Sequence, residues 1–303
     1  LFESGSLQMM AELVASVKSE TYLAIPTKER KGHQAASSAQ HRVWYLHKMQ
    51  GESLEYNILA GVMIRGALDA DLLDKTLSQL IQRHAILRTS YGEQNGQCVQ
   101  CIHEHIEHQL DCVDIGHMPN VEHDDEIQRL MQAQLNTGFD LERGPVLRTQ
   151  LIRQAQDKHV LLFCMHHIAS DGWSMALISQ DFMTIYQALS NGEDVGLAPL
   201  PIEYADYAEW QLQSQNSDDY QQNCDYWLNQ LADLPALHDL PLDHPRGPSR
   251  SNAGQGLERQ LSSAASDALR RLAQQQKSTL FMVLYSAFSL HLSRLSNQRD
   301  IVI

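Results

Sequence analysis

The chain has 303 residues, 43% of them hydrophobic, which is enough for one large domain or two of ordinary size, each with a buried core. Its formal net charge of -14, without a cluster of lysines and arginines, excludes a general nucleic-acid binder. No apolar run is as long as a membrane span, and five cysteines, an odd number, favour a reducing compartment, so we expect a cytoplasmic protein without membrane contact.

The first half of the chain alternates helical and strand patterns. Residues 1–18 contain a short amphipathic helix from residue 4, and residues 19–36 lose periodicity and indicate a linker. A domain then begins. We expect a helix at 37–49, a strand at 58–65, a helix from residue 69, a strand within 86–91 and a helix from 123 to about 137.

The second half continues the alternation and then changes character. Strands at 146–153 and 158–168 and a helix at 172–190 complete a mixed α/β domain, which we place at 37–200. A proline-rich bridge contains one helix at 217–232, and helices at 263–276 and 279–295 follow. Residues 300–303 have the pattern of a buried strand, so we expect residues 201–303 to hold the bridge and the start of a second, incomplete lobe.

Two adjacent histidines end the apolar strand pattern at 158–168. Because side chains alternate on a strand, His166 and His167 are predicted to point to opposite faces, which makes them a poor metal chelate. Asp171 and Gly172 follow at the predicted start of a helix, where unsatisfied N–H groups carry partial positive charge. A base beside such groups suits attack on a carbonyl, although two core histidines and a helix cap would give the same pattern.

Four ordered stretches of the chain resemble the condensation domain of nonribosomal peptide synthetases. They are "SSAQHRVWYL" (37–46), "RHAILRTSY" (83–91), "MHHIASDGWS" (165–174) and "YADYAEWQ" (204–211), and "FDLERGPVLR" (139–148) fits as well. The resemblance begins near residue 34, and residues 1–18 resemble the last helix of an upstream carrier domain. It implies a truncated domain with the fold of chloramphenicol acetyltransferase, a pseudo-dimer of two lobes with a tunnel between them.

The resemblance also implies the reaction and its partners. The domain would join a donor acyl or peptidyl thioester to an acceptor aminoacyl thioester, each carried on the 4'-phosphopantetheine arm of a carrier domain, beside an adenylation domain. No intrinsic cofactor or metal is implied.

The family pattern assigns roles to individual residues of this chain. His167 would be the catalytic residue, as general base or as the group that positions the acceptor amine, and His166 would orient the loop. Asp171 would pair with an arginine, for which Arg83, Arg88 or a residue in the missing part of the domain are the candidates, and Gly172 would let the acceptor arm pack closely. The stretch at 204–211 is expected to be architectural.

Several alternatives to a condensation catalyst remain. The intact "HHxxxDG" pattern argues against the heterocyclising relatives and, with "YADYAEWQ", favours the subtype that joins two L-residues. An epimerisation domain shares the fold and the motif, and a noncatalytic relative recruits tailoring enzymes. A metal site in "CVQCIHEHIEH" (98–108) is disfavoured, because alternation would spread Cys101, His103 and His105 along one strand face.

Overall fold

The computed structural model describes residue 8 and residues 24–27, 32–51, 53–234, 237–245 and 256–303. Within it the chain forms two compact units, Leu1–Asn216 and Ser217–Ile303. The carrier-like helix expected at residues 1–18 lies outside the described residues, apart from Gln8. The domain bounds expected from the sequence stay a prediction.

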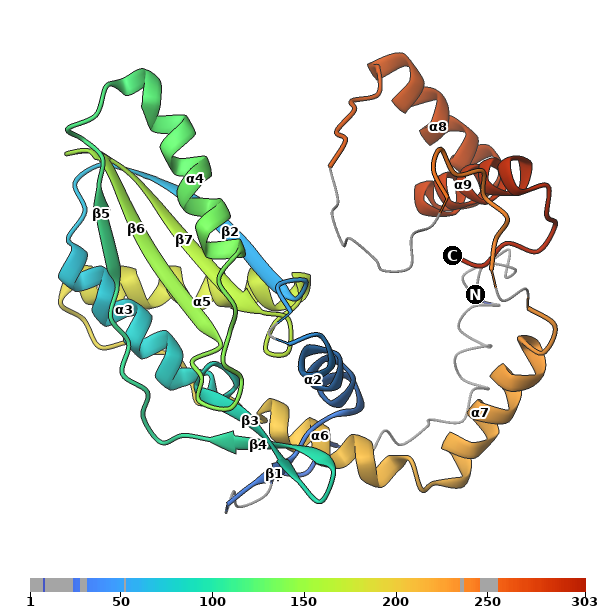
Figure 1. The fold of residues 1–303 in the computed structure, drawn as a ribbon, viewed down its shortest axis with the longest axis horizontal. Helices are drawn as coiled ribbons and strands as arrows, with labels where there is room; N and C mark the ends of the chain where they lie inside the picture. Colours follow the sequence, from blue (N-terminus) through green and yellow to red (C-terminus); the bar gives the residue numbers. More distant parts are fainter. Residues whose placement is uncertain (1–7, 9–23, 28–31, 52, 235–236, 246–255) are drawn as a thin grey trace. The chain divides into compact units, whose positions relative to one another are not determined.

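The first unit is built on a mixed four-stranded sheet (Figure 1). Its strands lie in the order β2 (Asn57–Arg65), β7 (Lys158–His166), β6 (Leu147–Ala155) and β5 (Asp111–Asp114). β7 pairs antiparallel with both β2 and β6, whereas β5 pairs parallel with β6. The three longer strands were expected, and the structure confirms them with ends shifted by one or two residues.

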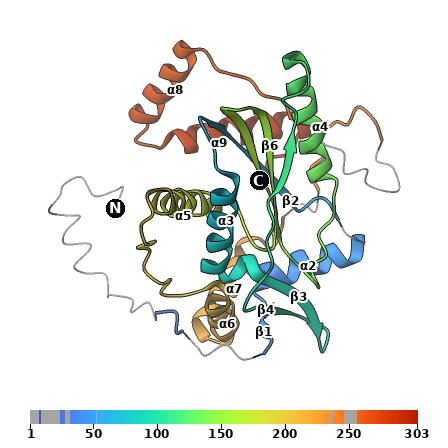
Figure 2. The ribbon, with the colours of Figure 1, turned by 90° about the vertical axis from the view of Figure 1, so that its left-hand side faces the viewer.

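Helices cover both faces of this sheet. α3 (Ala70–Arg83) and α5 (Gly172–Asn191) pack on the face that carries Leu161, Phe163 and Met165. α4 (His123–Leu135) packs on the other face, against Val160 and Leu162. Figures 1 and 2 show α4 on the side of the sheet away from α3 and α5. The apolar run of β7 is therefore continuous because both of its faces are buried.

A second, smaller sheet holds the start of the domain in place. It consists of β1 (Gln34–Ala35), β4 (Gln97–Ile102) and β3 (Thr89–Gln94), all antiparallel, and β3 follows a short 3-10 helix at Ala85–Arg88. The expected helix after residue 37 is α2 (Ser38–Gln50), which begins with a capping box between Ser37 and Gln40. Its Trp44 is buried against Tyr91.

One helix was not expected. The stretch predicted to be bridge forms α6 (Tyr204–Ser214), which begins with a capping box between Glu203 and Asp206. Its buried positions are Ala205, Asp206 and Ala208, so its inner face lacks the large apolar side chains that mark an amphipathic helix. The acidic capping residue followed by two alanines was the only local pattern that could have predicted this helix.

The second unit contains three helices among its described residues. They are α7 (Asp218–Gln230), α8 (Ser263–Gln275) and α9 (Leu280–Ser296), and they confirm the expected helices. The strand expected at 300–303 is wrong, because no strand among the described residues pairs with it and Val302 instead donates its N–H to His238 Nε2 (3.1 Å). Within the described parts of the chain, no helix is both long and apolar enough to cross a membrane.

Candidate functional site

The two adjacent histidines lie at the end of β7 and have opposite surroundings. His166 is the last residue of the strand and is fully buried, whereas His167 is exposed. The backbone N–H of His166 donates to the carbonyl of Val146 (3.0 Å), and that of His167 donates to the carbonyl of Tyr56 (2.7 Å). The backbones of the neighbouring chain segments thus fix one imidazole inside the fold and the other outside.

Aromatic rings surround the buried His166. Its ring packs edge-on against His47 (centroids 5.2 Å apart) and Phe139 (5.8 Å). Its Nδ1 accepts a hydrogen bond from the N–H of Ile168 (3.1 Å), so the proton of the neutral ring is on Nε2. Burial, and then the nearby positive groups, lower the pKa of His166 to about 3. His166 is therefore neutral at physiological pH and orients the chain after β7.

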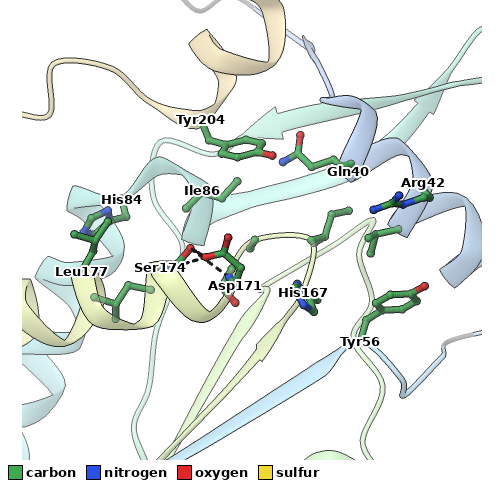
Figure 3. A pocket seen from close by; sticks show the side chains of 16 residues that line it. Gln40, Arg42, Tyr56, His84, Ile86, His167, Asp171, Ser174, Leu177 and Tyr204 are labelled. Atoms are coloured by element: carbon green, nitrogen blue, oxygen red, sulfur yellow. Dashed lines mark hydrogen bonds between the residues drawn. The ribbon is translucent and has the colours of Figure 1, made fainter. Parts of the chain in front are cut away.

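The exposed His167 lines a pocket of about 520 Å³ (Figure 3). One wall comes from α2, a second from the segment between α3 and β3, and a third from the first two turns of α5. The polar side chains that line it, besides His167, are Gln40, Arg42, Tyr56, His84, Ser170, Asp171, Ser174 and Tyr204. In Figure 3, His84 and Leu177 lie at one end, Arg42 and Tyr56 lie at the other, and Asp171 and His167 lie between them.

Asp171 caps the helix that forms the third wall. Its Oδ1 accepts hydrogen bonds from the backbone N–H of Ser174 (2.8 Å) and from the hydroxyl of Ser174 (2.6 Å). These bonds from Ser174 lower the pKa of the Asp171 carboxyl. An aspartate at this position satisfies an orphan helix N–H and faces the positive end of the helix dipole.

Neither candidate arginine pairs with Asp171 in the structure. Arg83 Nε donates to Asp181 Oδ2 (2.8 Å), and Arg88 donates to the backbone carbonyl of His103. Arg83 is the last residue of α3 and faces α5 nearly three turns beyond the cap, whereas Arg88 faces the chain that leaves β4. Both guanidinium groups thus donate to partners other than Asp171, which accepts from Ser174 instead, and the expected pairing of Asp171 with an arginine stays a prediction.

Gly172 is the first residue of α5 and has an ordinary negative φ. A Cβ built on it would meet no atom within 4 Å. Packing among the described residues therefore does not require glycine here. The open space beside it leaves room for a ligand, and its expected role in admitting the acceptor arm stays a prediction.

Two residues that line the pocket, Tyr204 and Gln40, were not predicted to do so from the sequence. Tyr204 was expected to be architectural, but it lines the pocket, and its hydroxyl lies 3.0 Å from Ser37 Oγ. Gln40 is buried, and its amide donates to the hydroxyl of Tyr91 (3.1 Å) and to Gln100 Oε1 (3.2 Å). Both belong to the quoted motifs, but only the fold shows that they line the same pocket as His167.

The cysteine and histidine stretch at 98–108 does not form the extended row expected from strand alternation. β4 ends at Ile102, and the chain then leaves the sheet. His103 Nε2 bonds to Ser90 Oγ (2.9 Å), whereas His108 bonds to Asp74 (3.1 Å) and to Thr149 (2.9 Å). Within the part of the chain that the structure describes, no three His, Cys, Asp or Glu side chains gather as a metal site would require.

Comparison with known families and proteins gives a consistent result. A family model described as "Condensation domain" matches residues 30–303. The chain is 35% identical to malpibaldin synthetase of Mortierella alpina and 34% identical to tyrocidine synthase 3 of Brevibacillus parabrevis, in both cases over 100% of its length. It spans only 6% and 4% of these two proteins.

Solved structures share the fold. The X-domain in its complex with OxyB from teicoplanin biosynthesis matches with a TM-score of 0.80 at 24% identity, over 92% of this chain and 61% of that one. The first condensation domain of the calcium-dependent antibiotic synthetase matches with a TM-score of 0.76 at 22% identity, over 90% and 64%. The expected mixed α/β fold of the chloramphenicol-acetyltransferase type is confirmed.

Proposed function

The chain belongs to the condensation-domain family of nonribosomal peptide synthetases, and on this basis we propose that it forms an amide bond between two carrier-bound thioesters. The donor is an acyl or peptidyl thioester and the acceptor an aminoacyl thioester, each on the 4'-phosphopantetheine arm of a carrier domain. The acceptor nitrogen attacks the donor carbonyl carbon and the C–S bond breaks. The amine's proton leaves, and the donor arm departs as a thiol.

One observation carries the proposal: His167 is exposed in a pocket while the histidine beside it is buried and neutral. An exposed imidazole can take a proton from the acceptor nitrogen, or hold that nitrogen by a hydrogen bond, during attack. Both roles remain open. The pocket walls would add to the rate by holding the two tethered groups together.

The residues present suit an arm that enters as a long, thin chain. The space beside Gly172 is open, and the pocket is lined by the apolar side chains of Ile86, Leu177 and Ile178 together with polar ones. The chain would need no cofactor of its own, because the arms arrive on partner carriers, with an adenylation domain as the expected neighbour. The intact motif and "YADYAEWQ" favour a partner pair of two L-residues.

A noncatalytic recruiting domain is a further candidate, besides an epimerisation domain. The X-domain, whose solved complex contains OxyB, shares the fold with a TM-score of 0.80. That likeness, at 24% identity, concerns the fold alone. Such domains tend to lose parts of the histidine motif, which is complete here, so we place condensation first. An epimerisation domain shares the motif.

The test is a single-turnover assay with protein containing this chain and two loaded carriers. Mass spectrometry of the acceptor carrier reports dipeptide. We expect His167→Ala to lower the rate by about 10² to 10⁴, the usual contribution of a proton-transferring group. The control is His105→Ala, which removes an exposed imidazole that does not line the pocket.

Each outcome selects one function. Dipeptide from the parent and the control, with a large loss in His167→Ala, supports condensation. Exchange of the donor's α-hydrogen with solvent, without dipeptide, assigns epimerisation. Absence of both with several cognate substrate pairs, together with binding of a tailoring enzyme, assigns recruitment.

A further inference from the structure

A second imidazole lines the pocket that contains His167. His84 follows the last residue of α3, and its backbone N–H donates to the carbonyl of Leu80 (3.1 Å), which fixes the residue at the helix end. Its ring reaches across to α5, where Nε2 lies 2.8 Å from Asp181 Oδ2. The two side chains are each only 16% exposed. Neither belongs to the histidine motif.

Three groups hold this imidazole in one orientation. Asp181 Oδ2 also accepts from Arg83 Nε (2.8 Å), and Arg83 Nη1 donates to the carbonyl of Ala198 (2.7 Å). The guanidinium thus anchors the carboxylate, and the carboxylate anchors the ring. A carboxylate that holds one nitrogen of a histidine while the other faces a reactant is a recurrent arrangement in catalytic and metal sites.

The bond to Asp181 decides what the other ring nitrogen can do. An ionised carboxylate only accepts hydrogen bonds, so Nε2 of His84 carries the proton, and a neutral ring leaves Nδ1 as an acceptor. Among the described residues no partner occupies Nδ1, and this atom is not one of the fully buried side-chain atoms that lack a partner. Since His84 lines the pocket and Nε2 is taken by Asp181, Nδ1 is the ring nitrogen left for a ligand.

The surroundings indicate what this acceptor would bind. Ile86, Leu177 and Ile178 line the same pocket, and Figure 3 shows Leu177 beside His84, so a ligand there exchanges water for hydrocarbon. An N–H group that enters such a place needs an acceptor, or it loses a hydrogen bond on binding. Acyl thioesters of the proposed reaction carry N–H groups in the two amides of the pantetheine arm and in the amino acid itself, and of these the cysteamine amide and the amino acid N–H lie nearest the thioester.

We propose that His84 accepts, through Nδ1, a hydrogen bond from an N–H group of the bound thioester, and that Asp181 and Arg83 are positioning residues for this contact. The proposal rests on the proposed function, because that function brings a thioester into the pocket. It makes His84 a specificity-determining residue, distinct from His167. A ligand without the N–H group would lose the contact.

Two substitutions separate the ligand contact from a merely structural role. In His84→Gln the side-chain amide nitrogen reaches the place of Nε2 and keeps the bond to Asp181, but nothing replaces Nδ1. In His84→Asn the amide oxygen takes the place of Nδ1, but the bond to Asp181 is lost. If His84 only holds α3 to α5 through Asp181, the Gln variant should bind the ligand as tightly as the parent does. If Nδ1 contacts the ligand, the Asn variant should do so instead.

The measurement is the equilibrium affinity of the full chain for a probe, determined by NMR titration. Urea unfolding of each variant checks its stability. The probe is the N-acetylcysteamine thioester of N-acetylalanine. We expect affinity to fall about five-fold in His84→Gln, the effect of one neutral hydrogen bond, and to stay within about two-fold in His84→Asn. Equal affinity of the parent and the Gln variant, or equal weakening in both variants, would overturn the proposal.

Two further probes identify the N–H group. The S-ethyl thioester of N-acetylalanine lacks the cysteamine amide, and propionyl-N-acetylcysteamine lacks the amino acid N–H. The probe with which the parent and the Gln variant no longer differ lacks the group that His84 binds. A difference that persists with both probes also overturns the proposal. If the parent binds none of the three, the pocket is not a thioester site, and the proposed function fails together with this inference.

Discussion

Asp171 offers the sharpest test of how the pocket is built, because two interpretations of this residue predict different results. In the structure its carboxylate caps α5 through two hydrogen bonds from Ser174, at 2.8 and 2.6 Å. Replacement of an N-cap aspartate by alanine costs about 1 kcal/mol, and loss of a negative charge at a helix N-terminus adds about 0.3 to 1 kcal/mol. We therefore expect Asp171→Ala to weaken α5 by about 1.5 kcal/mol. Asp171→Asn keeps the capping oxygen and should cost only about 0.5 kcal/mol.

Hydrogen exchange of the peptide that spans α5 measures this directly. If the helix opens locally, about 1.5 kcal/mol corresponds to roughly ten-fold faster exchange and about 0.5 kcal/mol to roughly two-fold. Asp194→Asn, an exposed aspartate beyond the end of α5, is the matched control and should change nothing. If Asn were as harmful as Ala, the charge itself would be required, and the arginine partner expected from the sequence would be right after all.

Two further predictions concern buried groups. Burial lowers the pKa of His166 to about 3, so between that pH and about 6.5 the unfolded chain binds a proton that the folded chain does not. This site should therefore lower the free energy of unfolding by about 1.4 kcal/mol for each pH unit below about 6.5. Urea titrations of His166→Phe should lack this effect. Arg148 donates to the backbone carbonyls of Gly138 (3.0 Å), Gln134 (3.0 Å) and Thr137 (2.8 Å), so Arg148→Met should lower the free energy of unfolding by about 2 to 4 kcal/mol. Arg148→Lys should restore little of this stability, because a single ammonium cannot reach three carbonyls. Full recovery of stability in the lysine variant would contradict the geometry.

The parts of the fold that follow from local pattern could be predicted from the sequence. β7 has a continuous apolar run because both of its faces are buried, and α3 has its leucines at helical spacing because Leu73, Leu77 and Leu80 all face the core. α6 was not predicted, because it buries alanines and an aspartate, and burial of small residues leaves no apolar stripe in the sequence. The pattern at 300–303 misled because an apolar segment becomes a strand only where a neighbour pairs with it.

The site was predictable only in part, for a related reason. Strand alternation placed His166 and His167 on opposite sides, and the structure agrees, although β7 ends between them. Partners across the fold did not follow from the sequence. Arg83 was a candidate for Asp171 because both lie in quoted motifs, yet the α3 and α5 helices bring it to Asp181. Which carboxylate a given arginine meets depends on helix packing, and helix packing has no local signature.

The different surroundings of the two adjacent histidines have a chemical consequence. Two imidazoles in sequence could share a proton or repel each other once both are charged. Burial first, and then neighbouring charges that include His167, lower the pKa of His166 to about 3, so this ring stays neutral at physiological pH and the two rings are not charged together. The hydrogen bond from Ile168 to Nδ1 also fixes the tautomer of His166, so the ring cannot act as a proton relay to His167 without breaking a backbone contact. In the proposed reaction, a proton taken up by this motif would therefore go to His167, and we expect a folded His166→Phe variant to keep most of the dipeptide formation that His167→Ala loses.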